Sequence, residues 1–155
     1  MEIEIFGVGT VSFKHIILDF NGTLAVSGVL KEGVREILEK LSKDFDIHVV
    51  TGDTFSSAKE QLKDLDVKTV IAPLINQSTF KLDYAKSIGL SNLVAIGNGK
   101  NDSLMLKYAR LGICVIGQEG ANIEAIQNSD IAVSDIISAL ELFVYPKRLV
   151  ATLRA

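Results

Sequence analysis

The sequence has 155 residues, of which 48% are hydrophobic and 23% are charged, and its formal net charge is −3. These values predict a single globular domain over residues 1–155 and argue against a disordered chain. A weakly negative chain has no general attraction to nucleic acid or anionic membranes, so we expect neither as a partner. No apolar run is long enough to span a membrane, and no secretion signal is recognisable. We therefore expect a cytoplasmic protein.

Stretches typical of strands alternate with stretches typical of helices along the chain. The first half predicts, in order, a hairpin over 2–13, a buried strand over 14–20, a short turn region over 25–30, a helix over 34–41 and a buried strand over 47–50. The second half predicts helices around 58–65, 84–88, 104–109, 122–127 and from 135, with strands over 67–72, 93–96, 113–116 and 131–133 between them. The segment 146–148 could continue a surface helix or meet a partner. Such alternation predicts an α/β fold, a mainly parallel sheet covered by helices on both faces.

Polar residues follow several of the predicted strands at the points where those strands end. Asp19 and Asn21 follow the first buried strand, and Thr51-Gly52-Asp53 follows the second. The run Gly97-Asn98-Gly99-Lys100-Asn101-Asp102 follows the strand over 93–96, and Lys81 opens the helix before that strand. Because the carboxyl ends of parallel strands share one edge of the sheet, we expect these side chains to meet there.

Each residue type has a role if the substrate is a phosphate. Asp19 can attack phosphorus and form an aspartyl-phosphate. Mg²⁺ prefers hard oxygen ligands, which Asp19, Asp102 and a backbone carbonyl near Asn21 would supply. Thr51 offers a hydroxyl and Gly52 an amide that phosphate can approach closely, while Lys81 would offset negative charge.

Structural explanations compete with these roles. Asp53 could cap the helix that follows it, and Asp102 could place negative charge in the first turn of its helix. Lys81 could be a solvated helix lysine, in which case Lys86 or Lys100 would compete for its role. His15 and His48 are expected to be structural, since neither has a partner at ligand spacing.

Taken together, Asp19-x-Asn21-Gly22-Thr23, Thr51-Gly52-Asp53, Lys81 and Gly97-x-Gly-x-Asn-Asp102 resemble the haloacid dehalogenase (HAD) superfamily. The sequence is most similar to the phosphorylation domain of P-type ATPases and to the proteins called soluble P-type ATPases. The resemblance implies a three-layer, Rossmann-like fold with no cap domain and with a small flap after the first buried strand, over residues 25–30. It implies Asp19 as the nucleophile, Thr51 on phosphate, Lys81 as the charge-balancing lysine, and Mg²⁺ held near Asp102.

Two residues depart from the family pattern. Asn21 stands where phosphatases of the family have an Asp that acts as general acid, a function worth roughly 10²–10⁴-fold in rate. Asn98 stands where the fourth motif usually has a metal-binding Asp, so its amide oxygen would replace a carboxylate and Mg²⁺ affinity should fall. We therefore expect slow turnover that favours good leaving groups.

The leading hypothesis is a Mg²⁺-dependent phosphatase that acts through Asp19. A capless site is open, so the partner could be a phosphoprotein, or a phosphorylated small molecule with a second copy of the chain covering the site. Two alternatives stay open. The chain could be a phosphate-binding, regulatory or assembly module, or it could cleave carbon–halogen bonds with the same nucleophile.

Overall fold

The core of the computed structural model, which describes residues 1–52 and 57–155, is a parallel sheet of six strands. Its order is β10 (Ile131–Val133), β9 (Leu111–Val115), β8 (Leu93–Gly97), β3 (His15–Leu18), β6 (Asp46–Thr51) and β7 (Lys68–Ile71). Every neighbouring pair is parallel, as the sequence predicts. The central strands are apolar runs because both of their faces are buried.

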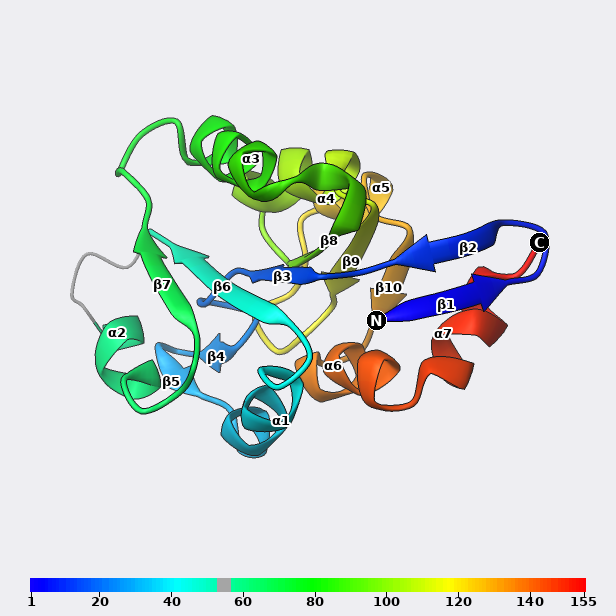
Figure 1. Cartoon of the computed structure of the whole chain (residues 1–155). Helices are drawn as coiled ribbons and strands as arrows, with labels where there is room; N and C mark the ends of the chain where they lie inside the picture. Colours follow the sequence, from blue (N-terminus) through cyan, green and yellow to red (C-terminus); the bar gives the residue numbers. More distant parts are fainter. Residues whose placement is uncertain (53–56) are drawn as a thin grey trace.

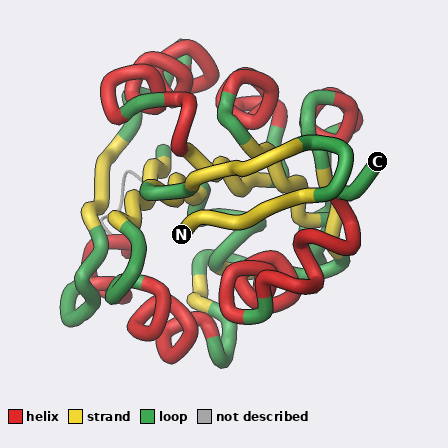
Figure 2. The backbone as a smooth tube through the Cα atoms, turned by 45° about the vertical axis from the view of Figure 1, so that its right-hand side comes forward, coloured by secondary structure: helices red, strands yellow, loops and turns green. Residues whose placement is uncertain are grey.

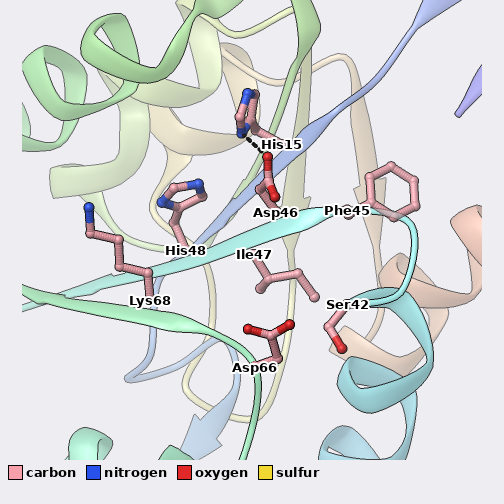
Figure 3. Close-up of a pocket in the computed structure, with 8 residues that line it drawn as sticks. All are labelled: His15, Ser42, Phe45, Asp46, Ile47, His48, Asp66 and Lys68. Atoms are coloured by element: carbon pink, nitrogen blue, oxygen red, sulfur yellow. Dashed lines mark ion pairs between the residues drawn. The ribbon is translucent and has the colours of Figure 1, made fainter.

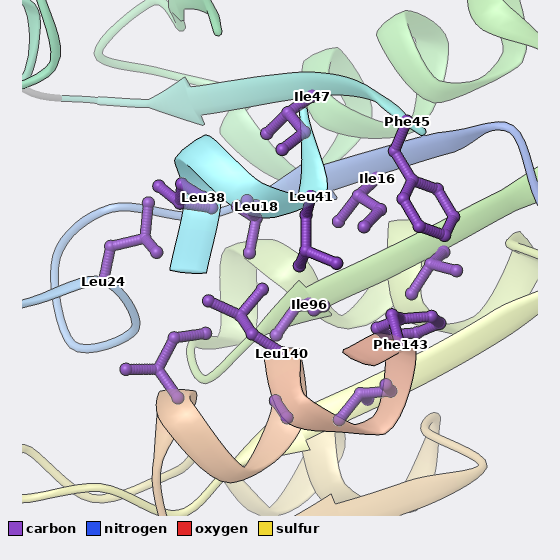
Figure 4. Close-up of a cluster of buried hydrophobic side chains, with 14 of the residues drawn as sticks. Ile16, Leu18, Leu24, Leu38, Leu41, Phe45, Ile47, Ile96, Leu140 and Phe143 are labelled. Atoms are coloured by element: carbon purple, nitrogen blue, oxygen red, sulfur yellow. The ribbon is translucent and has the colours of Figure 1, made fainter. Parts of the chain in front are cut away.

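Helices cover both faces of this sheet and make the three layers that the sequence predicts (Figure 1). One face carries α3 (Gln77–Ile88), α4 (Ser103–Tyr108) and α5 (Ile123–Gln127). The other carries α1 (Val34–Leu41), α2 (Ser57–Leu62), α6 (Ile136–Val144) and α7 (Pro146–Leu153). Each helix layer closes its own apolar core against the sheet. Figure 4 shows the core under α1 and α6, where Leu38 and Leu140 lie against Leu18 and Ile96 of the central strands.

Two antiparallel hairpins complete the fold. The first pairs β1 (Glu2–Ile5) with β2 (Gly9–Ser12), and α7 brings the C-terminus back beside it (Figure 2). The second pairs β4 (Ala25–Val26) with β5 (Val29–Leu30) and is the predicted flap. The flap is tied to α2 because the amide of Leu30 donates to Oε1 of Gln61 at 2.7 Å. Two short 3₁₀ turns occur at Leu90–Asn92 and Lys100–Asp102.

Two helix boundaries differ from the sequence-based expectation, and a third decides the segment that the sequence left open. Helix α3 begins at Gln77, so Lys81 lies in its second turn and does not open it. Helix α2 ends at Leu62, and the buried Leu65 lies beyond its end. The segment left open at 146–148 starts a separate helix, α7, because Pro146 cannot continue α6 but fits a first helical turn. Within the described residues no helix is long and apolar enough to cross a membrane.

Candidate active site

The carboxyl ends of the strands surround a pocket of about 260 Å³. Eight residues line it: Asp19, Asn21, Thr51, Gly52, Gln77, Asn98, Gly99 and Asn101. The sheet register explains why they meet. Leu18 of β3 is paired with Val49 of β6 and with Ile96 of β8, so the residues that follow these three strands emerge together. The structure thus brings five predicted site residues, Asp19, Asn21, Thr51, Gly52 and Asn98, to one pocket.

Lys81 joins two carboxylates behind this pocket. Its ammonium group donates to Oδ1 of Asp19 at 2.5 Å and to Oδ1 of Asp102 at 2.7 Å. Lys81 and Asp102 are fully buried, and Asp19 is 5% exposed. The competing lysines, Lys86 and Lys100, have side chains that are more than half exposed. Lys81 is therefore the lysine that the fold brings to Asp19.

Burial and charge set the protonation of these groups. Burial raises the pKa of Asp19 to about 7, and the negative charge of Asp102 acts in the same direction against the opposing effect of Lys81. For Lys81, burial alone would lower the pKa, but the attraction of Asp102 and Asp19 outweighs it and raises the pKa overall. Lys81 thus stays a cation across the physiological range. One buried positive charge shared by two carboxylates leaves an excess of negative charge that a second cation would relieve.

Asp102 also fixes the loop after β8. Its second oxygen, Oδ2, accepts from the backbone amides of Asn98 at 3.0 Å and of Gly99 at 2.9 Å. It lies in the 3₁₀ turn just before α4 and does not line the pocket. These contacts to Lys81 and to the loop show that Asp102 does more than place negative charge in the first turn of its helix. They place Asp102 behind the site, where it orients both Lys81 and the loop.

Asn98 ties the loop after β8 to the loop after β3. Its Oδ1 accepts from the Thr23 hydroxyl at 3.2 Å, and its Nδ2 donates to the carbonyl of Gly120 at 3.0 Å. Gly22 has a φ of 80°, and a Cβ built on it would lie 2.3 Å from Nδ2 of Asn98. Only glycine allows this approach. Asn21, just before it, is exposed at the pocket.

The run Thr51-Gly52-Asp53 begins with Thr51, which is the last residue of β6 and is 1% exposed. Gly52 follows it, and the side-chain amide of Gln77 lies directly over Gly52. Asp53 was considered as a helix cap, but it lies outside the described residues. The pocket therefore places a hydroxyl and a glycine backbone beside Asp19, which is the arrangement expected for binding a phosphoryl group.

Sequence reasoning missed Gln77 and assigned no role to Asn101. Nδ2 of Asn101 donates to Oε1 of Gln77 at 2.9 Å, and both residues line the pocket. Asn101 belongs to the motif run after β8, whereas Gln77 belongs to no motif. The available signal was spacing, because residues four apart in a helix share a face, as Gln77 and Lys81 do. Placing the start of the helix at its true position would have revealed Gln77.

Oxygen atoms dominate the ligands that this pocket can offer a metal ion. Asp19 contributes a carboxylate, and Asn21 and Asn98 contribute amide oxygens. Among residues 1–52 and 57–155, no three His, Cys, Asp or Glu side chains are arranged to hold a metal by themselves. The donor set fits a small, hard cation such as Mg²⁺, which uses one or two carboxylates and fills its shell with water and phosphate oxygens.

The two histidines lie at the opposite end of the strands, away from the pocket described above. They line a second cavity of about 260 Å³ with Asp46 and Lys68 (Figure 3). Nδ1 of His15 is 3.4 Å from the Asp46 carboxylate, and Nδ1 of His48 is 2.8 Å from the Tyr84 hydroxyl. Burial lowers the pKa of His48. Nδ1 of His15 and Nε2 of His48 are buried and make no hydrogen bond among the described residues, so the structural role of the two histidines stays a prediction.

Comparison with known proteins shows relatives in sequence and a shared fold. No family model matches the chain. The uncharacterized protein MJ0073 of Methanocaldococcus jannaschii is 58% identical over 62 residues, which make up 40% of this chain and 67% of that protein. The copper-transporting ATPase HMA4 of Oryza sativa subsp. japonica is 30% identical over 129 residues. That match covers 78% of this chain but only 13% of the ATPase.

Solved structures share the whole architecture at low sequence identity. The deoxy-D-mannose-octulosonate 8-phosphate phosphatase of Haemophilus influenzae superposes with a TM-score of 0.71 at 15% identity, covering 93% of this chain and 94% of that one. The 3-deoxy-D-manno-octulosonate 8-phosphate phosphatase of Moraxella catarrhalis, solved with magnesium, phosphate and KDO, gives 0.67 at 18% identity and covers 92% and 94%. A putative HAD superfamily hydrolase of Legionella pneumophila gives 0.69 at 12% identity and covers 90% and 86%.

Proposed function

We propose that this chain, which belongs to one family with the uncharacterized MJ0073 and has the HAD fold, is a Mg²⁺-dependent phosphatase that works through an aspartyl-phosphate. The observation that carries the proposal is the arrangement of Asp19, Lys81 and Asp102. A carboxylate at the end of the central strand faces a pocket, and a fully buried lysine joins it to a second carboxylate. Hydroxyl and amide donors in the same pocket suit a phosphoryl group.

The reaction follows from these positions in two steps. In the first, a carboxylate oxygen of Asp19 attacks phosphorus, and the bond from phosphorus to the leaving oxygen breaks. The Thr51 hydroxyl and the backbone beyond β6 donate hydrogen bonds to the phosphoryl oxygens, while the charge of Lys81 offsets developing negative charge. In the second step water attacks phosphorus and loses a proton to the solvent, the bond from phosphorus to the Asp19 oxygen breaks, phosphate leaves, and the Asp19 carboxylate is restored.

Leaving groups set the rate of the first step. Asn21 carries an amide that cannot donate a proton as a carboxylic acid does, so the leaving oxygen departs as an anion or takes its proton from water. General acid catalysis is worth roughly 10²–10⁴-fold, and its loss weighs most on alkoxides, which are poor leaving groups. Acyl and aryl phosphates, whose leaving groups are weak bases, are therefore the best substrates.

The pocket residues also fit the metal. Asp19, Asn21 and Asn98 would offer it oxygen atoms, and the loop that Asp102 fixes would hold Asn98 in place. When bound, Mg²⁺ would supply positive charge close to the phosphoryl oxygens. Asp102 lies behind the pocket and is already bonded to Lys81, so direct ligation by Asp102 needs a shift of its carboxylate.

An aryl-phosphate assay with and without Mg²⁺ tests the proposal. We expect slow release of phosphate that depends on Mg²⁺ and on the concentration of the wild-type protein. Asp19→Asn should abolish release, whereas Asp83→Asn, a change at an exposed carboxylate on α3, should leave it intact. Equal rates in wild type and Asp19→Asn would overturn the mechanism.

A second candidate is a binding or regulatory module that holds phosphate without useful turnover. Asn98 favours it, because both ends of its amide are engaged with Thr23 and Gly120 and the residue brings no negative charge. Capture of beryllium fluoride at Asp19 without turnover of any acyl or aryl phosphate would support this module over the enzyme.

The setting of either function is also a proposal. The pocket is covered by no separate cap domain in the described residues, so we propose that its substrate is a phosphorylated small molecule or an exposed residue of a phosphoprotein. A second copy of the chain could cover the pocket. We place this activity in the cytoplasm.

A further inference from the structure

We propose that Gln77 binds the phosphoryl group through its side-chain Nε2, as a neutral donor beside Thr51. The proposal rests on the phosphatase function above and adds a substrate-binding residue to it. Gln77 is the first residue of α3, one turn before Lys81 on the same face of that helix. It lines the same pocket as Asp19 and Thr51.

The direction of the Gln77 amide is set by its neighbour. Nδ2 of Asn101 donates to Oε1 of Gln77 at 2.9 Å, so the oxygen end of the amide is taken up by Asn101. The nitrogen end then lies over Gly52, because a Cβ built there would be 2.3 Å from Nε2. Gly52 follows Thr51 directly. The amide nitrogen is therefore held beside the residues proposed to bind phosphate.

The Gln77 nitrogen is also available. Among the described residues Nε2 of Gln77 makes no hydrogen bond, and the residue is half-buried in the pocket wall. Nε2 is not fully buried, so water reaches it and a phosphoryl oxygen can take the place of that water. Helix α3 favours an anion at this point, because its first turn carries no acidic residue and its N-terminus bears partial positive charge.

The ammonium group of Lys81 already binds two carboxylates, so the phosphoryl oxygens need other hydrogen-bond donors in the pocket. Gln77 supplies one without adding charge, and the glycine at position 52 makes room for it. A purely structural role would be different: Gln77 would only accept from Asn101 and hold that residue in place. The two roles use opposite ends of the same amide, which makes them separable.

The test compares Gln77→Glu with Gln77→Met at pH 8. Glutamate keeps an oxygen for Asn101 but loses the donor and adds charge, whereas methionine keeps the approximate size and loses both hydrogen bonds. We expect both variants to bind inorganic phosphate and beryllium fluoride about 10-fold to 100-fold more weakly than wild type. We expect Gln77→Glu to be the weaker of the two. Binding is measured by calorimetry in the presence of Mg²⁺.

Gln127→Glu, the same change on the exposed end of α5, controls for net charge and should bind as wild type does. If Gln77→Glu binds as well as wild type, or better than Gln77→Met, then Gln77 only supports Asn101 and the inference is wrong. If wild type binds neither ligand and turns over no aryl phosphate, the proposed function itself fails and this inference fails with it. Unfolding curves of the variants confirm that the fold is retained.

Discussion

Asn21 and Asn98 carry amides where HAD phosphatases usually carry carboxylates, and the two residues have different surroundings in the structure. Asn21 is exposed at the pocket, whereas Asn98 holds two loops together with both ends of its amide. In the proposed mechanism Asn21 is the position where a proton donor is missing, whereas the amide of Asn98 makes two hydrogen bonds of its own. A carboxylate at 98 would lose the donor that Gly120 accepts from.

The first prediction concerns the missing acid. Asn21→Asp should raise the rate on alkyl phosphates by up to roughly 10²-fold and change the rate on aryl phosphates little, because only poor leaving groups need protonation. Steady-state rates on a matched pair of alkyl and aryl phosphates check this. A uniform change on both substrates would mean that position 21 does not face the leaving group.

Lys81 gives the second prediction, which is about stability. Lys81→Met should lower the free energy of unfolding by about 3–5 kcal/mol in metal-free protein at pH 8, because two buried carboxylates lose their shared cation. Lys86→Met removes an exposed lysine 3.6 Å from Asp83 and should cost less than about 1 kcal/mol. Chemical denaturation of both variants measures the difference, and equal losses would contradict the buried bridge.

At the scale of elements, two glycines in the loops after β3 and β4 allow backbone strain to be separated from a steric clash. Gly22 and Gly28 both have positive φ, at 80° and 77°. A Cβ on Gly22 would strike Asn98, whereas a Cβ on Gly28 would meet nothing within 4 Å. Gly28→Ala therefore measures backbone strain alone, of about 1–2 kcal/mol, and Gly22→Ala adds the contact. We expect Gly22→Ala to be the more destabilising by denaturation and to weaken phosphate binding. Equal effects would show that the Gly22–Asn98 contact is unimportant.

Helix α6 begins at a cap whose effect depends on pH. Oδ1 of Asp135 accepts from the amide of Ser138 at 2.9 Å, and its other oxygen accepts from the Ser138 hydroxyl at 2.7 Å. The hydrogen bond to the Ser138 backbone lowers the pKa of Asp135 below its usual 3.8. A lowered pKa means that the stabilisation is present above pH 4 and is lost as pH falls through the folded-state pKa.

The expected result is that Asp135→Ala costs about 1 kcal/mol at pH 7 and less at pH 3. Unfolding free energies of the variant and wild type at the two pH values measure this, with retained helix content as the control. A cost that grows as pH falls would contradict the lowered pKa.

At the scale of the whole molecule, the fold was predictable where apolar patterns are strong. The six parallel strands and the N-terminal hairpin follow from buried runs and turn residues, as predicted, whereas the segment 25–30 was predicted only as a turn and flap and forms a second hairpin. The start of α3 was not predictable, because Gln77, Ser78 and Thr79 are polar and present no apolar stripe. Asn76 is of a residue type favoured at a helix N-cap, but it has a φ of 58° and its side chain makes no cap hydrogen bond.

The candidate site was predictable to a similar degree. The motifs indicated Asp19, Thr51, Lys81 and Asp102, but no local pattern could show that one lysine bridges two carboxylates. That contact joins Lys81 on α3 to Asp19 after β3 and exists only once the sheet has assembled. Gln77 was missed because the predicted helix began too late to include it, and its contacts with Gly52 and Asn101 come from other elements.

The central claim is that Asp19 carries the phosphoryl group, and the most direct measurement is the location of that group. Protein is mixed with Mg²⁺ and a radiolabelled acyl phosphate, quenched in acid and digested, and the labelled peptide is sequenced. The account predicts a label that is released by hydroxylamine and lies on the peptide containing Asp19, and no label in Asp19→Asn. Turnover with no acid-stable label, or a label on any other residue, would contradict it.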